Sequence, residues 1–329
     1  MAGSTPVPGA ASPDRGTQPP GVDYALFAAT VMLWGTTWIA LKLQLGTIAP
    51  QVSLVWRFLI AAPIMLIVAR SLGAPLLFPL RTHLRFVLLA ALMFSTNFML
   101  FYNAGTFVVS GLLSVIFSLA SVLNILLAAV ILKEPIRGRV AAGALLGVTG
   151  AILLFGHEVD ASALGLQALV GLGLGTLGTL SFCLGNMMSA ATQRDGIPVL
   201  SSTAWGMVYG VGINAAVALA TGASFAIDPE PAYLLSLVWL AIPGSVGAFW
   251  IYLALLGRMG ADRAAYTTVL SPVLALLVST LFEDYRWSAM AFGGIALVVA
   301  GNVLVLTGRR APQRPSGRAS EARIDSIAR

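Results

Sequence analysis

Charged residues are scarce in this sequence, and cysteine is almost absent. Only 10% of its 329 residues are charged, 58% are apolar, and the mean hydropathy is +0.89. Soluble globular domains carry about a quarter of charged residues, so this composition excludes an ordinary soluble protein. The single cysteine, Cys183, excludes an intrachain disulfide, and we expect it to serve in packing. The composition is that of a membrane protein.

Buried acids and metal motifs are also missing. No Asp or Glu falls deep inside an apolar segment, and both histidines, His83 and His157, lie at segment ends. A buried proton relay is therefore not expected. The sequence contains no HExxH motif, no paired aspartates and no phosphate-binding P-loop. We predict no enzyme activity, no cofactor and no metal.

The net charge of +6 comes from basic residues that are scattered singly or gathered in the last 21 residues. Nucleic-acid binding needs a basic stripe along one face, which this pattern does not form. We therefore predict no nucleic-acid partner. The expected partners are the lipid bilayer and a small-molecule substrate, with the protein a monomer or a weak homo-oligomer.

Ten apolar segments are long enough to cross a bilayer, which takes about 17 to 25 residues. They are 24–43, 51–69, 84–103, 107–132, 139–156, 164–190, 199–221, 233–256, 264–282 and 287–307. The sequence thus predicts an all-α membrane protein of ten transmembrane helices. Residues 1–22, rich in Pro, Gly, Ser and Thr, and the basic tail 309–329 are predicted to be disordered and cytoplasmic.

The basic residues predict the orientation, because short cytoplasmic loops retain Lys and Arg. With the N-terminus cytoplasmic, all 19 basic residues except Lys42, Arg57 and Arg286 fall on the cytoplasmic side. The external loops then hold acidic residues such as Glu283 and Asp284. We expect a multi-pass protein of the cytoplasmic (inner) membrane with both termini cytoplasmic.

The two halves of the chain resemble each other at an offset of 150 residues. This shift aligns Gly35 with Gly185, Tyr102 with Tyr252, Ser121 with Ser271, Glu134 with Asp284 and Gly143 with Gly293. The alignment predicts two five-helix repeats, residues 23–157 and 158–308. Five is odd, so the second repeat must be inverted, an architecture typical of secondary transporters with a substrate site near the midplane. Chance similarity between apolar helices is the alternative.

Aromatic and neutral polar side chains lie well inside several segments. Asn97 and Phe101 share one helix face at i and i+4, as do Phe98 and Tyr102. Polar groups in a membrane helix face the bundle or a cavity. We expect a substrate cavity lined by Trp34, Thr37, Trp38, Asn97, Phe98, Phe101, Tyr102, Ser118, Ser121, Asn186, Trp250, Tyr252 and Tyr266.

Structural alternatives stand beside these assignments. Ser and Thr can bond to their own helix or join neighbouring helices, and Trp near segment ends, such as Trp239 and Trp287, fits the interfacial belt. Arg57, the strong charge well inside a segment, either snorkels outward or holds an anion such as a substrate carboxylate. We expect Lys42 to snorkel. Gly143 and Gly147 have the small-xxx-small spacing of closely packed helices.

Several motifs resemble a known family. The stretches "WGTTWIALK", "WRFLIAAPIML", "GTFVVSGLLSVIFSLASVLNILLAAVILKEP", "YLALLGRMGADRAAYTTVLSPVLALLVSTLFED" and "GGIALVVAGNVLVL" are similar to the two EamA repeats of the drug/metabolite transporter superfamily. With ten predicted helices and aromatic-rich third and eighth segments, the chain looks most like the bacterial YddG-type amino-acid exporters. Pro272 has no counterpart in the first copy, so the two halves need not bend alike.

The resemblance implies a basket of inverted helices that exports amino acids, often aromatic or other neutral ones, through a central cavity. A cavity of Tyr, Trp, Asn and Ser suits such substrates, because amides bind the polar end and aromatic faces accept varied side chains. The predicted function is therefore an alternating-access exporter of amino acids. Export of other small metabolites or cationic drugs is the alternative, and a passive channel would be a different class.

Overall fold

The chain folds into a bundle of helices in this computed structural model, which describes residues 20–131, 133, 135–161, 165–259, 264 and 266–308. No strand occurs among these described residues. Within them, nine helices are long and apolar enough to cross a membrane, and Thr267–Phe282 is a shorter apolar helix. The predicted all-α membrane class is therefore confirmed.

The helices follow the predicted segments closely. In the first half they are α1 (Pro20–Lys42), α2 (Pro50–Ser71), α3 (Leu80–Leu89), the π-helical segment η1 (Ala90–Thr96), α4 (Asn97–Gly105), α5 (Ser110–Ser118), α6 (Ala120–Ile131) and α7 (Gly138–Ala161). In the second half they are α8 (Gly165–Arg194), α9 (Val199–Ala220), α10 (Pro231–Ala241), η2 (Ile242–Gly247), α11 (Ala248–Met259), α13 (Thr267–Phe282) and α14 (Ala289–Gly308).

Two predicted boundaries fall inside helices. Residues 20–22, assigned to a disordered leader, are the start of α1, and the expected repeat boundary at 157/158 lies within α7. The rest of the predicted leader and the tail 309–329 lie outside the described residues. Helix ends follow ordinary backbone rules: Pro50 and Pro231 open α2 and α10, where no N–H partner is needed.

Among the residues that the structure describes, each half contains one π-helical segment, in its third membrane helix. The segment η1 joins α3 to α4, and η2 joins α10 to α11. A π turn leaves backbone carbonyls without their usual partners, and side chains from neighbouring helices supply donors around η1. The Asn214 amide donates to the carbonyl of Phe94 at 3.0 Å, and the Ser181 hydroxyl donates to that of Leu92 at 2.8 Å. These hydrogen bonds fix η1 against α8 and α9.

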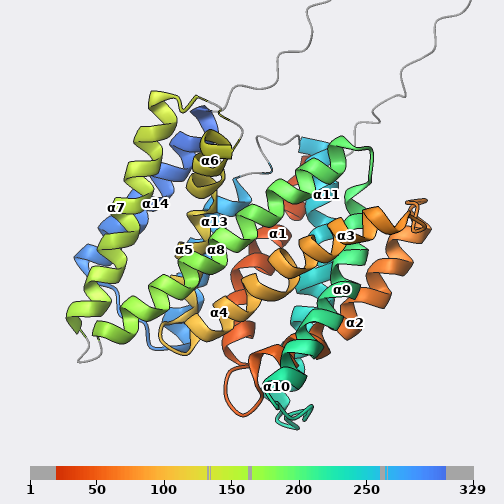
Figure 1. Ribbon diagram of the computed structural model, residues 1–329. Helices are drawn as coiled ribbons and strands as arrows, with labels where there is room; N and C mark the ends of the chain where they lie inside the picture. The colour runs from red at the N-terminus through yellow and green to blue at the C-terminus, as the bar shows by residue number, and fades with distance from the viewer. Residues whose placement is uncertain are drawn as a thin grey trace, which may run out of the picture.

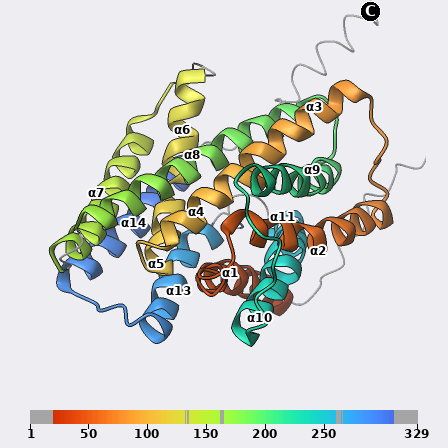
Figure 2. The same ribbon diagram turned by 60° about the horizontal axis from the view of Figure 1, so that its bottom comes forward.

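Helices at equivalent places in the two halves pack against each other in three pairs: α2 with α9, α5 with α13, and α7 with α14. In both views α7 and α14 lie side by side at one edge, and α2 and α9 lie near the opposite edge (Figure 1, Figure 2). The pairs run antiparallel. Along α2 and α9, for example, Gln51 donates to Thr221 at 3.0 Å, while Phe58 faces Gly210. Antiparallel pairing is what two oppositely oriented repeats require.

Glycines bring α7 and α14 into backbone contact. A Cβ added to Gly150 would lie 2.5 Å from the carbonyl oxygen of Gly294, and one added to Gly143 would lie 2.7 Å from that of Gly301. A Cβ on Gly147 would meet its neighbours at an ordinary 3.8 Å. The close packing predicted for Gly143 and Gly147 is present, because a Cβ added to Gly301 would lie 2.5 Å from the Gly143 oxygen and 2.6 Å from the Gly147 nitrogen.

Candidate functional site

A cavity of about 610 Å³ lies inside the helix bundle and is lined by both halves of the chain. The first half contributes α1, α2, the α3–η1–α4 rod, α5 and α6, and the second half contributes α8, α9, η2, α11, α13 and α14. This volume falls within the range of small-molecule sites, about 300 to 1,000 Å³. The cavity is therefore large enough for an amino acid or a molecule of similar size.

Aromatic rings form much of the cavity wall. Trp34 of α1 lies against Tyr252 of α11 with ring centroids 5.0 Å apart, and Trp38 meets the edge of Phe101 at 5.0 Å. Both distances are those of favourable aromatic pairs. Because the rings come from α1, α4 and α11, the wall joins the two halves and presents apolar faces to a ligand.

Amides and hydroxyls gather where α6 and α8 approach the cavity. Ser121 and Asn124 come from α6, and Asn186 and Ser189 come from α8. Among the described residues, no partner hydrogen-bonds the side-chain amides of Asn124 and Asn186. The hydroxyl of Ser118, by contrast, donates to the carbonyl of Val115 at 2.7 Å. The two amides are thus available to a polar ligand.

Asn97 has a structural partner although it also lines the cavity. Its side-chain amide donates to the carbonyl of Gly178 at 2.8 Å, and only 3% of the residue is exposed. A Cβ on Gly178 would touch the ring of Phe101 at 3.0 Å, so α4 and α8 lie close together here. The amide of Asn97 therefore joins two helices.

Arg57 lies in the cavity wall and does not snorkel. Only 2% of the residue is exposed, and its guanidinium carbon is 4.4 Å from the ring centroid of Phe98. The Nε and Nη2 groups both donate to the hydroxyl of Ser245 at 3.2 Å. Nη1 is buried and has no hydrogen-bond partner among the described residues. Among the described lining residues, Arg57 is the one with a charged side chain.

Most predicted site residues meet at this cavity. Those in its lining are Trp34, Thr37, Trp38, Arg57, Asn97, Phe98, Phe101, Ser118, Ser121, Asn186 and Tyr252. Three predicted residues lie outside it: Tyr102, Trp250 and Tyr266. Tyr102 is fully buried and donates its hydroxyl to Gln44, and Trp250 is 54% exposed. Two residues along a helix turn by about 200°, so Trp250 faces away from the cavity that Tyr252 enters. Tyr266 immediately precedes α13.

Other lining residues were not anticipated. They include Met93, Phe94, Ser114, Phe117, Phe182, Thr203, Met207 and Ser245. Phenylalanine and methionine are common in any apolar helix, so the sequence does not indicate that these residues line a cavity. Ser245 belongs to η2, and its orientation depends on a π turn that the sequence does not reveal.

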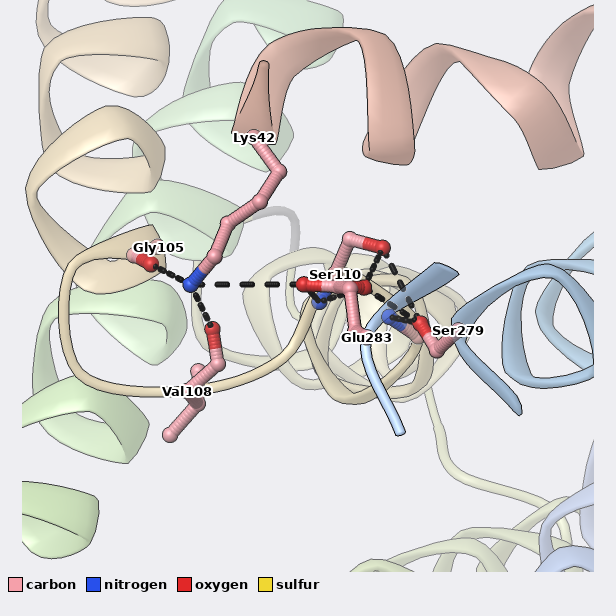
Figure 3. Close-up of polar contacts among 7 residues, drawn as sticks. Lys42, Gly105, Val108, Ser110, Ser279 and Glu283 are labelled. Carbon is pink, nitrogen blue, oxygen red and sulfur yellow. Dashed lines mark hydrogen bonds and ion pairs between the residues drawn. The ribbon is translucent and has the colours of Figure 1, made fainter. Parts of the chain in front are cut away.

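A polar network lies next to the lining residues Leu41 and Ser114, at one end of the cavity. Figure 3 shows its contacts. Lys42, at the end of α1, donates to the carbonyls of Gly105 and Val108 and lies 4.0 Å from the carboxylate of Glu283. Glu283 in turn accepts from the backbone N–H of Ser110 at 2.9 Å and from the hydroxyl of Ser279 at 2.7 Å. Lys42 is therefore engaged in the bundle rather than snorkelling. We call these six residues the polar network.

The network joins the ends of four helices. Lys42 ends α1, Gly105 ends α4, Ser110 begins α5 and Ser279 lies in α13, while Val108 lies between α4 and α5 and Glu283 follows α13. The Glu283 carboxylate meets the N-terminal N–H group of α5. A second contact at this end links the two halves. The Thr47 hydroxyl donates to Asp228 at 2.8 Å, and this bond and the Glu230 N–H, which has the larger effect, keep the pKa of Asp228 below its usual value.

The cavity extends toward the opposite end of the bundle. Its lining reaches Val199, the first residue of α9, and Leu306, two residues before the end of α14. At the network end, Lys42 and Glu283 lie beyond the lining residues Leu41 and Ser114. The polar network thus covers one end of the cavity. At the other end, residues close to the helix termini belong to the cavity lining.

Comparison with known families matches the EamA-like transporter family twice, over residues 23–156 and 169–307. The chain belongs to the EamA-like transporter family. The two matched stretches cover most of the protein and correspond to the two halves whose equivalent helices pair. They confirm the resemblance drawn from the EamA motifs. The protein is accordingly a multi-pass member of a family of membrane transporters.

Several curated proteins are similar to this EamA-like transporter over nearly their whole length. A "probable amino-acid metabolite efflux pump" of Escherichia coli (strain K12) is 26% identical over 304 residues, 88% of this chain and 97% of that protein. "Protein PecM" of Dickeya dadantii (strain 3937) is 26% identical over 290 residues, 86% of this chain and 91% of that protein. A protein crystal structure shares the fold with a TM-score of 0.62 and 18% identity, covering 86% of this chain and 96% of the other.

Proposed function

We propose that this EamA-like transporter exports amino acids, aromatic and other neutral ones first, by alternating access through the cavity between its two halves. The observation that carries the proposal is the lining of that cavity by both halves. If the halves move relative to each other, the same binding residues can face either side of the membrane. The similarity to a probable amino-acid metabolite efflux pump supports the substrate class.

The proposed topology has ten membrane helices in two inverted repeats, 23–157 and 158–308, with both termini cytoplasmic in a bacterial inner membrane. The tenth proposed span is α13, an apolar helix whose 16 residues are slightly fewer than the about 17 to 25 of a usual membrane helix. The antiparallel pairs formed by equivalent helices support the inversion. The distribution of Lys and Arg supports the orientation. In this proposed orientation the polar network faces the external side, and the cavity end near Val199 and Leu306 faces the cytoplasm.

The lining favours an amphipathic ligand. Rings such as Trp34, Trp38 and Tyr252 offer apolar faces, and the free amides of Asn124 and Asn186 offer donors and acceptors. A phenylalanine-sized molecule can place its side chain against the rings and its polar end toward polar groups. This arrangement binds through shape and hydrogen bonds and requires no acid–base chemistry.

Counterflow in proteoliposomes tests the proposal. Vesicles containing the purified protein are loaded with unlabelled phenylalanine and diluted into a trace of labelled phenylalanine. Transient accumulation above the outside concentration is expected, because an alternating carrier exchanges the two pools. Protein-free vesicles are the control. Equilibration without accumulation would indicate a passive channel, and the absence of uptake for every amino acid would overturn the proposed substrate class.

A further inference from the structure

Arg57 carries a buried positive charge that no acidic residue neutralises. No carboxylate forms an ion pair with it among the described residues, and none occurs in the described cavity lining. A buried charge is costly unless a counter-ion or well-placed hydrogen bonds compensate. The ring of Phe98 offsets part of this cost through a cation–π contact at 4.4 Å.

The hydrogen bonds that Arg57 donates to Ser245 occupy one edge of the guanidinium group, and the hydroxyl of Tyr102 also interacts with this group. Nε and Nη2 share the hydroxyl oxygen of Ser245, and that hydroxyl donates its own proton to the carbonyl of Leu240 at 2.8 Å. Ser245 is thereby held as an acceptor for Arg57. The other edge, formed by Nη1 and the second N–H of Nη2, has an unpartnered nitrogen at Nη1. Such an edge matches the two oxygens of a carboxylate.

The π segment η2 creates this arrangement. Ser245 lies in η2, and its hydroxyl donates to the carbonyl of Leu240, five residues earlier. In a regular α-helix a serine hydroxyl bonds a carbonyl three or four residues earlier. The contact joins α2 of the first half to the third membrane helix of the second half. The guanidinium is consequently held in one orientation at the junction of the two halves.

We propose that Arg57 binds the carboxylate of the transported molecule and that the cavity selects apolar carboxylates whether or not they carry an ammonium group. This inference rests on the proposed function and narrows its substrate class. A carboxylate neutralises the charge of Arg57, whereas an ammonium group meets no acidic side chain in the described lining. Small monocarboxylates with an aromatic side chain should therefore bind as well as the corresponding amino acid, and cations should bind poorly.

Ligand binding at this edge requires one neighbour to move, since only 2% of Arg57 is exposed. Phe98 is the neighbour placed for that role. Its ring lies against the guanidinium and also lines the cavity. Rotation of this ring gives a ligand in the cavity access to the guanidinium and leaves the Ser245 hydrogen bonds in place.

Binding to the purified full-length protein, measured by calorimetric titration, tests the proposal without relying on transport. Phenylalanine, phenylpyruvate and 3-phenylpropionate share a carboxylate, whereas phenylalaninamide and phenethylamine lack one. The three carboxylates are expected to bind with affinities within a few-fold of one another. The two amines should bind at least about tenfold more weakly, as expected for the loss of a charge-assisted hydrogen bond.

Variants assign the effect to the side chain. Arg57→Gln should weaken carboxylate binding by about 10- to 100-fold, and Arg57→Lys, which keeps the charge without the fork, should weaken it less. Arg70→Gln, an exposed arginine at the other end of the same helix, is the matched control and should bind normally. Folding of each variant is checked by its elution as a single detergent-solubilised species.

Two outcomes would overturn the assignment: amines that bind the wild-type protein as tightly as carboxylates, or a folded Arg57→Gln variant with unchanged carboxylate affinity. The ligand series on the wild-type protein decides the first outcome even if the variants fail to fold. Carboxylate binding without any counterflow would instead contradict the proposed transport function and leave the role of Arg57 intact.

Discussion

Two asparagines near the cavity have different surroundings and should respond differently to substitution. The Asn97 amide donates a hydrogen bond to the carbonyl of Gly178 in the neighbouring helix α8. The Asn186 amide faces the cavity with no partner among the described residues. One side chain therefore contributes to stability and the other to ligand binding.

Asn97→Ala should lower stability by about 0.5–1.5 kcal/mol, because it removes the hydrogen bond that joins α4 to α8. Asn186→Ala should leave stability nearly unchanged and raise the KM for counterflow by several-fold. The measurements are thermal unfolding in detergent and transport in proteoliposomes. Asn103→Ala is the matched control, since that exposed amide bonds only to its own helix at Met99. Equal loss of stability for both cavity variants would contradict the distinction.

The sequence could predict which residue types line the cavity, but not how each side chain is engaged. Trp34, Trp38 and Phe101 follow from aromatic residues deep in apolar segments. The sequence could not show that Phe101 lines the cavity while Tyr102 does not, because adjacent positions differ by only about 100° around the helix. The pairing of Tyr102 with Gln44 depends on how α1 and α4 pack, which a single sequence does not encode locally.

At the scale of helices, the backbone contact between α7 and α14 distinguishes two glycines on one helix. Gly150→Ala places a methyl group 2.5 Å from the Gly294 carbonyl, so the helices must separate. Overpacking of this kind costs about 1–3 kcal/mol, and a lower unfolding temperature is expected. Gly147→Ala is the control, because its methyl group has ordinary room and alanine favours a helix. A Gly147→Ala variant as unstable as Gly150→Ala would contradict this packing.

Under the proposed alternating-access mechanism, the polar network holds one end of the bundle closed. Glu283→Gln removes the negative charge that Lys42 and the Ser110 N–H share. Opening at this end should therefore become more frequent. In a Cys183→Ser background, Ser114→Cys places a thiol in the cavity lining next to this end. An impermeant maleimide added to whole cells should label that thiol several-fold faster when Glu283→Gln is present.

The neighbouring acid supplies the control for that experiment. Asp284 is exposed and adjacent to Glu283, so Asp284→Asn should leave the labelling rate unchanged. Faster labelling with both variants would point to a general surface-charge effect. Labelling that requires access from the cytoplasmic side would contradict the proposed orientation.

The positions of the helices could be predicted, because they follow from the lengths of the apolar segments. The irregularities within the helices could not. Every predicted segment contains a helix, within a few residues at each end. The π segments η1 and η2 depend on donors such as Asn214 from other helices. The fourth predicted segment is interrupted at Leu119 without any proline, where Ser114 and Ser118 donate to their own helix backbone. Pro272, in contrast, lies inside the continuous helix α13.

For the whole molecule, the two ends of the bundle are not equivalent. At the offset of 150 residues that relates the halves, Lys42 corresponds to Thr192 and Glu283 to Lys133. The ion pair of the polar network therefore has no counterpart in the other half. Two halves with a shared fold thus differ in the side-chain contacts that hold their ends.

Cross-linking that end should stop transport if the carrier alternates between two open states. Ser110 of α5 and Ser279 of α13 have their hydroxyl oxygens 3.0 Å apart, so cysteines at these two positions bring their sulfur atoms close together. In the Cys183→Ser background, Ser110→Cys combined with Ser279→Cys should lose counterflow on oxidation and regain it on reduction. Each single cysteine variant should be insensitive to the oxidant. Full counterflow through the cross-linked protein would show that α5 and α13 need not separate during transport. That result would contradict alternating access, which requires this end to open.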